Sequence, residues 1–155
     1  MSFTLKPGKY IITSVLSNNG IGRYSREDMS LLPKNIYHLT SDQKPAVWDV
    51  NMSGDGYILT ANGPGRSGHA ACIDDKLFAV LLDFPAPDRW RIIPSGSDGP
   101  GCYVIAQTTG RSGWVVEGNA DDLTQIVLKP LLMTPSEPPH YPPFQVFKFT
   151  RVDRA

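Results

Sequence analysis

The sequence has little of what several common protein classes require. Lysine and arginine total 15, aspartate and glutamate also total 15, and neither sign forms a long run. This balance argues against a nucleic-acid or acidic-lipid partner. No apolar run approaches membrane-spanning length, and the N-terminus lacks the long apolar core of a signal peptide. We therefore expect a cytoplasmic protein that does not associate with membranes.

Cysteine and histidine are also scarce. The two cysteines, Cys72 and Cys102, stand in apolar strand contexts and are expected to be buried thiols rather than a disulfide. The three histidines are scattered, with no second ligand at the spacing that a metal site requires: His38, His69 and His140. The sequence predicts neither a metal nor a cofactor.

Catalytic motifs are missing as well. No G-x-S-x-G occurs, and the aspartates sit mostly at turns without a convincing carboxylate pair. Residues 63–68 match G-x-G-x-x-G, but no helix follows to supply a phosphate-binding N-terminus. These observations predict a binding protein rather than an enzyme.

What the chain does contain is an internal repeat. Residues 48–57 and 90–103 share an indole, a β-branched residue two places on, Ser-Gly, Asp-Gly and then tyrosine. A weaker third copy is split between the two ends of the chain, at residues 147–149 and 8–12. Tyr10, Tyr57 and Tyr103 recur at intervals of about 46 residues. Self-similarity at a fixed period is a strong fold signal.

The repeat and the composition together predict an all-β fold. The chain has 14 glycines and 14 prolines and almost no window of apolar residues at helical spacing. Roughly twelve short strands in three pseudo-threefold units predict a single β-trefoil domain over residues 1–155, a six-stranded barrel capped by three hairpins. The repeats run over about 8–55, 56–100 and 101–154. Trp48, Trp90 and Phe147 are expected to fill equivalent core positions.

A Gly-Arg pair recurs at one hairpin of each unit, at Arg23, Arg66 and Arg111. Because this feature is shared, these three arginines are interpreted as structural. Repeat 3 carries about a dozen extra residues within 129–143, a proline-rich stretch that predicts a stiff, extended excursion.

Arg26 breaks the repeat, because it has no counterpart in the other units. It stands on a polar loop that replaces a strand, and Leu31, Leu32 and Pro33 are expected to pin the base of that loop. A basic side chain on a braced loop is what the primary pocket of a trypsin-like protease binds. Rigidity would lower the ordering cost of binding. A solvated surface arginine is the competing interpretation.

The chain also resembles the mushroom (basidiomycete) β-trefoil serine protease inhibitors of the cospin and cnispin type. The resemblance rests on residues 8–13, on the Asn-Gly-Ile-Gly-Arg turn at 19–23, and on Trp48 and Trp90. It implies a monomeric inhibitor of trypsin-like serine proteases that acts in fungal defence. The implied reactive-site loop holds Arg26 at the primary specificity position, with Arg23 as the fallback and with Tyr24, Ser25 and Glu27 around them.

Other sites and functions stay open at this point. Cnispin-type members imply a lysine before the proline-rich excursion, which is Lys129 here, and a second protease at another loop is geometrically allowed. Related inhibitors of cysteine proteases, including legumain, imply Asn62 instead, although Asn-Gly is also an ordinary turn. A β-trefoil lectin would carry Gln-x-Trp in each unit, and only Gln145 stands near that position.

Overall fold

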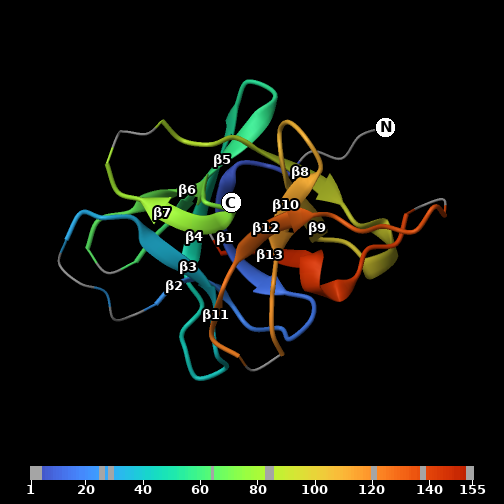
Figure 1. Cartoon of the computed structure of the whole chain (residues 1–155), viewed down its shortest axis with the longest axis horizontal. Helices are drawn as coiled ribbons and strands as arrows, with labels where there is room; N and C mark the ends of the chain where they lie inside the picture. Colours follow the sequence, from blue (N-terminus) through green and yellow to red (C-terminus); the bar gives the residue numbers. More distant parts are fainter. Residues whose placement is uncertain are drawn as a thin grey trace.

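The computed structural model describes residues 5–24, 27, 30–63, 65–82, 86–119, 122–136 and 139–152. Within these ranges the chain forms thirteen strands and two short 3-10 helices, η1 (Gly96–Asp98) and η2 (Pro143–Gln145) (Figure 1). The strands are β1 (Gly8–Ser14), β2 (Ile21–Arg23), β3 (Lys34–His38), β4 (Val47–Ser53), β5 (Gly56–Ala61), β6 (Gly68–Ile73), β7 (Lys76–Val80), β8 (Trp90–Pro94), β9 (Cys102–Gln107), β10 (Ser112–Val115), β11 (Thr124–Gln125), β12 (Val127–Pro130) and β13 (Phe147–Arg151). No helix in the described part is long and apolar enough to span a membrane.

Local sequence explains the hairpins. Along β1, buried and less buried residues alternate, which is the period-2 pattern of a strand with one face on the core. The β6–β7 turn places Asp74 and Asp75 at φ values of 52° and 60°, a left-handed pair that short hairpin turns favour. At the β4–β5 turn Gly54 takes φ 60°. These turns fix the register of both hairpins.

The strands close into a ring. Nine antiparallel strands follow one another in the order β7, β12, β10, β9, β13, β1, β4, β5 and β6, and β6 pairs back with β7. The first and last strands lie side by side, with Tyr10 opposite Arg151 and Ser14 opposite Phe147. The repeat unit that the sequence divides between the two ends of the chain is thus brought together across this pair.

The prediction of an all-β chain is confirmed, but the prediction of a β-trefoil is wrong. The closed ring contains nine strands within one thirteen-stranded sheet, whereas the β-trefoil expectation was twelve strands with six in the barrel. The repeats correctly indicate local hairpins such as β4–β5 and β6–β7. They carry no information on how strands from different units pair. Two pairings between strands of different units, β12 with β7 and β13 with β1, help to close the larger ring.

Aromatic side chains fill the interior of the ring. Trp48, Trp90 and Phe147 are at most 1% exposed, which confirms their predicted place in the core. All three surround Trp114, whose ring centroid lies 5.6 Å from each of the two indoles and 6.0 Å from the Phe147 ring. Trp114 sits at the centre of this cluster, a role that the sequence analysis did not predict.

The surroundings of the two cysteines and of His38 are those of structural residues. Both cysteines are free thiols, as predicted, with Cys102 buried and Cys72 partly buried. His38 is fully buried; its Nε2 lies 2.7 Å from Ser17 Oγ and its Nδ1 2.7 Å from the Asp122 carbonyl oxygen. Among the described residues, no group of three His, Cys, Asp or Glu side chains could hold a metal ion.

Candidate functional site

The excursion between β2 and β3, two strands that lie outside the nine-strand ring, carries the predicted reactive-site residues. β2 and β3 pair in antiparallel register, with Ile21 opposite His38 and Arg23 opposite Ile36. Ser25 and Arg26 lie outside the described residues. Tyr24 and Glu27, which stand on either side of them in the chain, are described.

Arg23 is buried and faces into the molecule. Its side chain is 1% exposed and forms an ion pair with the Glu27 side chain, which is 10% exposed. Nε donates to Glu27 Oε2 at 2.9 Å, and Nη2 donates to Glu27 Oε1 at 2.6 Å. Two parallel bonds between a guanidinium and a carboxylate are both strong and geometrically restrictive. Glu27 is therefore fixed relative to the end of β2.

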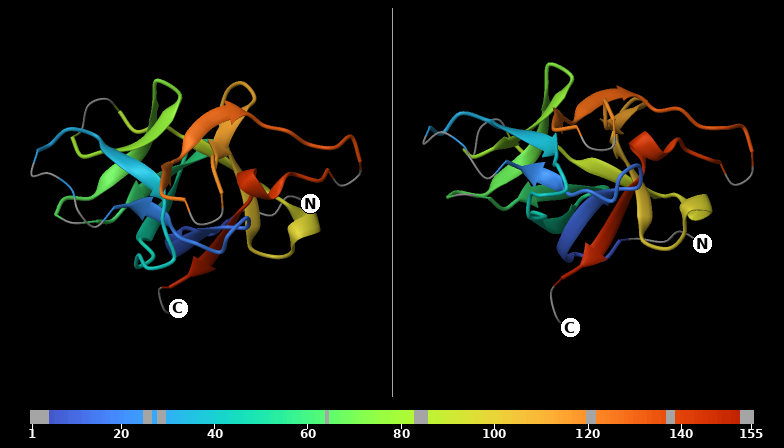
Figure 2. Two further views of the ribbon diagram at one scale, coloured as in Figure 1. Left: turned by 60° about the horizontal axis from the view of Figure 1, so that its bottom comes forward. Right: turned by 90° about the horizontal axis from the view of Figure 1, so that it is seen from below.

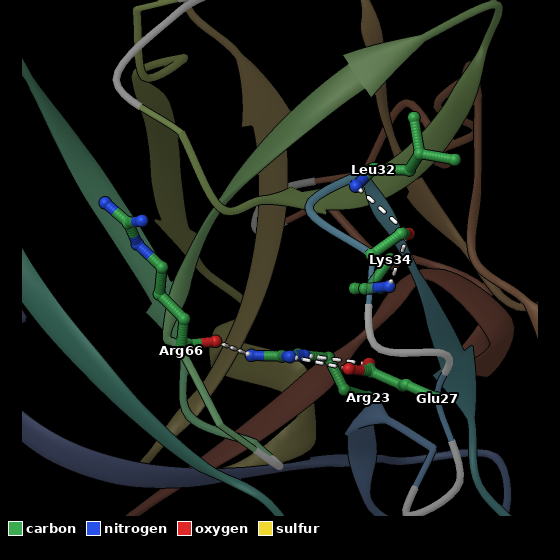
Figure 3. Close-up of polar contacts among 6 residues, drawn as sticks. Arg23, Glu27, Leu32, Lys34 and Arg66 are labelled. Atoms are coloured by element: carbon green, nitrogen blue, oxygen red, sulfur yellow. Dashed lines mark hydrogen bonds and ion pairs between the residues drawn. The ribbon is translucent and has the colours of Figure 1, made fainter.

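The same guanidinium contacts a second loop, between β5 and β6. Nη1 donates to the Arg66 carbonyl oxygen at 2.6 Å. A Cβ at Gly63 would meet Arg23 Cζ and Nε at 2.8 Å, so only glycine leaves room for the guanidinium there. Figure 3 shows the Arg23 guanidinium between the Arg66 carbonyl and the Glu27 carboxylate, with the Arg66 side chain pointing away. Arg23 thus connects the β2–β3 segment to the β5–β6 loop.

Further contacts hold the two ends of the excursion. The Tyr24 ring packs edge-on against Tyr37 of β3, with centroids 6.1 Å apart. Near the return to β3, Ser30 Oγ accepts hydrogen bonds from the Leu32 backbone N–H and from Lys34 Nζ, each at 3.3 Å (Figure 3). The segment is therefore held at Tyr24, at Glu27 and at Ser30.

The apolar residues expected to pin the loop do not do so. Leu31 is 51% and Leu32 65% exposed, and Pro33 is exposed too, so that prediction is wrong. The loop is held instead by an ion pair, by hydrogen bonds and by an aromatic contact. The one sequence signal of this bracing is the Arg-x-x-x-Glu spacing of Arg23 and Glu27, which the sequence analysis did not use. The contact with Gly63 and Arg66 has no local sequence signal.

The shared arginines differ from one another in the structure. Arg23 is buried, as its structural interpretation requires, whereas Arg66 and Arg111 are exposed. Arg66 contributes its backbone carbonyl to the contact with Arg23, and any residue at this position would provide that carbonyl.

Comparison with known proteins identifies the family. The family model for peptidase inhibitor I66 matches residues 1–151. The chain belongs to this family of peptidase inhibitors. The predicted mushroom protease inhibitor family is thereby confirmed, and the relatives described next are inhibitors rather than enzymes.

Two similar fungal proteins cover nearly the whole inhibitor. It is 34% identical to a serine protease inhibitor of Lentinula edodes over 151 residues, 97% of this chain and 100% of that protein. The solved structure of a proteinase inhibitor from Coprinopsis cinerea is 35% identical, with a TM-score of 0.86, and the match covers 96% of this chain and 100% of that one.

A more distant likeness concerns the fold alone. The ricin B-like lectin of Macrolepiota procera in complex with lactose is 16% identical, with a TM-score of 0.67 over 97% of this chain and 100% of that one.

The alternative reactive-site residues of the inhibitor lie on other elements. Lys129 is an exposed residue of β12, opposite Gly113, and its Nζ pairs with Glu117 Oε2. Asn62 follows β5; its N–H donates to the Val47 carbonyl at 3.0 Å, and its Oδ1 accepts from Ser67 Oγ at 2.8 Å. Asn62 is thus held in the same loop that Arg23 contacts, whereas Lys129 lies on β12.

Proposed function

We propose that this inhibitor blocks trypsin-like serine proteases by presenting the β2–β3 segment as a substrate-like loop, with Arg26 at the primary specificity position. The observation that carries the proposal is the Arg23–Glu27 ion pair, which fixes the residue directly after Arg26 to the end of β2. Tyr24, held by Tyr37, fixes the other flank. A loop that is ordered before binding gives up little conformational entropy when it enters a protease cleft.

The pairing also answers an objection to Arg26. An acidic residue directly after a scissile position is a poor neighbour for a protease, but the Glu27 carboxylate is engaged by Arg23 and largely buried. Its charge is neutralised inside the inhibitor. This arrangement favours Arg26 over Arg23, because the Arg23 guanidinium would have to leave a buried ion pair to enter a protease pocket.

The test is a titration of bovine trypsin with the inhibitor, following residual hydrolysis of a small chromogenic substrate. We expect stoichiometric loss of activity. Replacing Arg26 with alanine should weaken trypsin binding by about 3 kcal/mol, as expected for a central anchor. The free energy of unfolding should change by less than about 0.5 kcal/mol, because the described bracing contacts remain. Arg89→Ala is the matched control, since Arg89 is a half-exposed arginine that forms a 4.0 Å ion pair with the exposed Asp55.

Two outcomes would contradict the proposal. Full trypsin activity at micromolar inhibitor would remove trypsin-like proteases as targets, and inhibition of legumain or papain would then direct attention to Asn62. Unchanged inhibition by the Arg26→Ala variant would move the reactive site to Lys129 or Arg23. The monomeric state and the cytoplasmic location stay predictions, and gel filtration tests the first of them.

A further inference from the structure

A second excursion leaves the barrel at the other end of the molecule. It runs from the end of β12 to η2 and includes residues 131–136 and 139–142 in the described part. Figures 1 and 2 show it, in orange and red, at the opposite end of the long axis from residues 30–33, drawn in light blue. The two excursions are therefore far enough apart to be approached from different sides.

A buried glutamine holds the outgoing arm of this second excursion. Gln145 is fully buried in η2, and its side-chain amide makes two hydrogen bonds to the backbone of Leu132. Nε2 donates to the Leu132 carbonyl oxygen at 2.6 Å, and Oε1 accepts from the Leu132 N–H at 3.0 Å. One residue earlier, the Leu131 N–H donates to the Arg111 carbonyl at 2.8 Å. A buried amide with both ends satisfied fixes the backbone that it binds.

Thr134, two residues after Leu132, is fixed by the arm of the excursion that returns to η2. The Thr134 N–H donates to the His140 carbonyl at 2.9 Å, and the His140 N–H donates to Thr134 Oγ1 at 3.0 Å. Thr134 Oγ1 also lies 2.6 Å from Ser136 Oγ. These hydrogen bonds join the outgoing and returning arms of the excursion at Thr134.

Met133 stands between these two fixed residues. Its side chain is 61% exposed, and Leu132 beside it is 57% exposed. Among the described residues, no hydrogen bond involves the Met133 backbone. The N–H and C=O of Met133 are therefore available to another chain, while the backbone on either side is held. An exposed apolar side chain on a fixed backbone loses little entropy when it enters a pocket.

We infer that Met133 is the primary specificity residue of a second reactive site, directed at serine proteases whose primary pocket is apolar. Methionine is unbranched and polarisable and fills an apolar slot of the chymotrypsin kind, whereas the acidic pocket of trypsin selects arginine or lysine. This inference rests on membership of the inhibitor family and not on Arg26. Because the two excursions lie at opposite ends, one inhibitor should hold two proteases at once.

The first experiment titrates bovine chymotrypsin with the full-length inhibitor and follows residual hydrolysis of a small chromogenic substrate. The wild-type inhibitor should block chymotrypsin, and Met133→Ala should raise the inhibition constant by about 100-fold or more. Met133→Leu should retain inhibition, because leucine also suits an apolar pocket. Met52→Ala is the matched control, since Met52 is 52% exposed on β4, which belongs to neither excursion. Chymotrypsin left fully active, or inhibition unchanged by Met133→Ala, would overturn the inference.

A specificity exchange separates this site from the one proposed at Arg26. The double variant Arg26→Ala/Met133→Arg should inhibit trypsin through the second excursion and lose chymotrypsin inhibition. In the wild-type inhibitor, size-exclusion chromatography should show a complex of one inhibitor with both proteases. Chymotrypsin inhibition that is lost in Arg26→Ala instead of Met133→Ala would refute the second site. If the inhibitor blocked chymotrypsin but not trypsin, the proposal for Arg26 would be wrong and the inference about Met133 would stand.

Oxidation supplies a chemical test that does not depend on replacing Met133 with a smaller residue. Peroxide converts an exposed methionine to its polar sulfoxide. Treatment should abolish chymotrypsin inhibition by the wild-type inhibitor and leave the Met133→Leu variant active. Equal loss in both would show that Met133 is not the residue that enters the protease.

Discussion

The Arg23 guanidinium and the Glu27 carboxylate form a two-bond ion pair that is almost completely buried, with side-chain exposures of 1% and 10%. Its two partners stand on either side of Arg26 in the chain. The same arginine reaches the Arg66 carbonyl in the β5–β6 loop. One buried cation therefore organises two loops that sequence reasoning treated as separate candidate sites.

Removing the carboxylate of this pair should destabilise the inhibitor measurably. Glu27→Ala leaves a buried guanidinium without its counter-ion, and breaking such a pair costs about 3 kcal/mol in the free energy of unfolding. Urea denaturation measures the change. Trypsin inhibition should weaken in the same variant, because Glu27 would no longer fix the loop.

The control for Glu27→Ala is an exposed ion pair of the same protein. Lys9 Nζ lies 2.6 Å from Asp49 Oδ1, with the lysine side chain 53% exposed. Lys9→Ala should change the free energy of unfolding by less than about 1 kcal/mol, since exposed pairs contribute little. Equal losses in the two variants would mean that burial does not set the strength of the Arg23–Glu27 pair.

Gly63 should tolerate no side chain. A Cβ at this position would lie 2.8 Å from two atoms of the Arg23 side chain, which is held by Glu27 and cannot move away freely. Gly63→Ala should therefore cost about 2 kcal/mol through overpacking. Gly96→Ala is the matched control, because a Cβ there would meet nothing within 4 Å. If both variants unfold at the same urea concentration, the close approach of Arg23 to the β5–β6 loop is not present in solution.

Sequence reasoning located most strands because each one carries its own signal. The β-branched and aromatic residues from Cys102 to Gln107 predict a strand and form β9 without change, and the strand predicted in the same way from Tyr57 to Ala61 differs from β5 by one residue. The three-residue strand β2 was missed, since Ile21-Gly22-Arg23 follows an Asn-Gly turn and is too short to show alternation. The apolar pattern from Gln125 to Leu128 predicts a single strand, but these residues are divided between β11 and β12.

The errors in the architecture and in the bracing of the loop have a common physical cause, because both features depend on contacts between distant residues. The nine-strand ring closes through pairings between repeats, such as Val127 with Lys76. The loop brace depends on Arg23 meeting the Arg66 carbonyl, 43 positions away along the chain. The repeat period of the sequence predicts neither this strand pairing nor the contact between Arg23 and Arg66. Membership of a protease inhibitor family, by contrast, was accessible because short local motifs carried the resemblance.

The tryptophan at the centre of the core should respond differently from its neighbours. The Trp48 indole N–H donates to the Ile21 carbonyl at 2.7 Å, whereas the buried Trp114 Nε1 has no partner among the described residues. Trp114→Phe removes an unsatisfied donor, but Trp48→Phe breaks a hydrogen bond. Trp48→Phe should be the more destabilising by about 1 kcal/mol. Urea denaturation of both variants checks the order, and a larger loss for Trp114→Phe would show that ring packing outweighs the indole hydrogen bond.

The free thiols should make the inhibitor less stable in mild alkali. Burial raises the pKa of the Cys102 thiol, with Asp98 adding to the shift, and burial is also the largest cause of the raised pKa of Cys72. A raised pKa in the folded state means that the folded chain keeps these protons at a pH where the unfolded chain releases them. The stabilisation is fully present below the ordinary thiol pKa of about 8.5 and is lost as the pH rises from there through the folded-state pKa values.

The measurement is the free energy of unfolding from urea denaturation at several values between about pH 7.5 and pH 10, the range below the ordinary tyrosine pKa. It should fall more steeply with pH in the wild-type inhibitor than in a Cys72→Ala/Cys102→Ala variant. The absolute stability of the variant will be lower because both substitutions remove partly or fully buried atoms, so only the slopes are compared. Parallel slopes would mean that the two thiols titrate alike in the folded and unfolded chains.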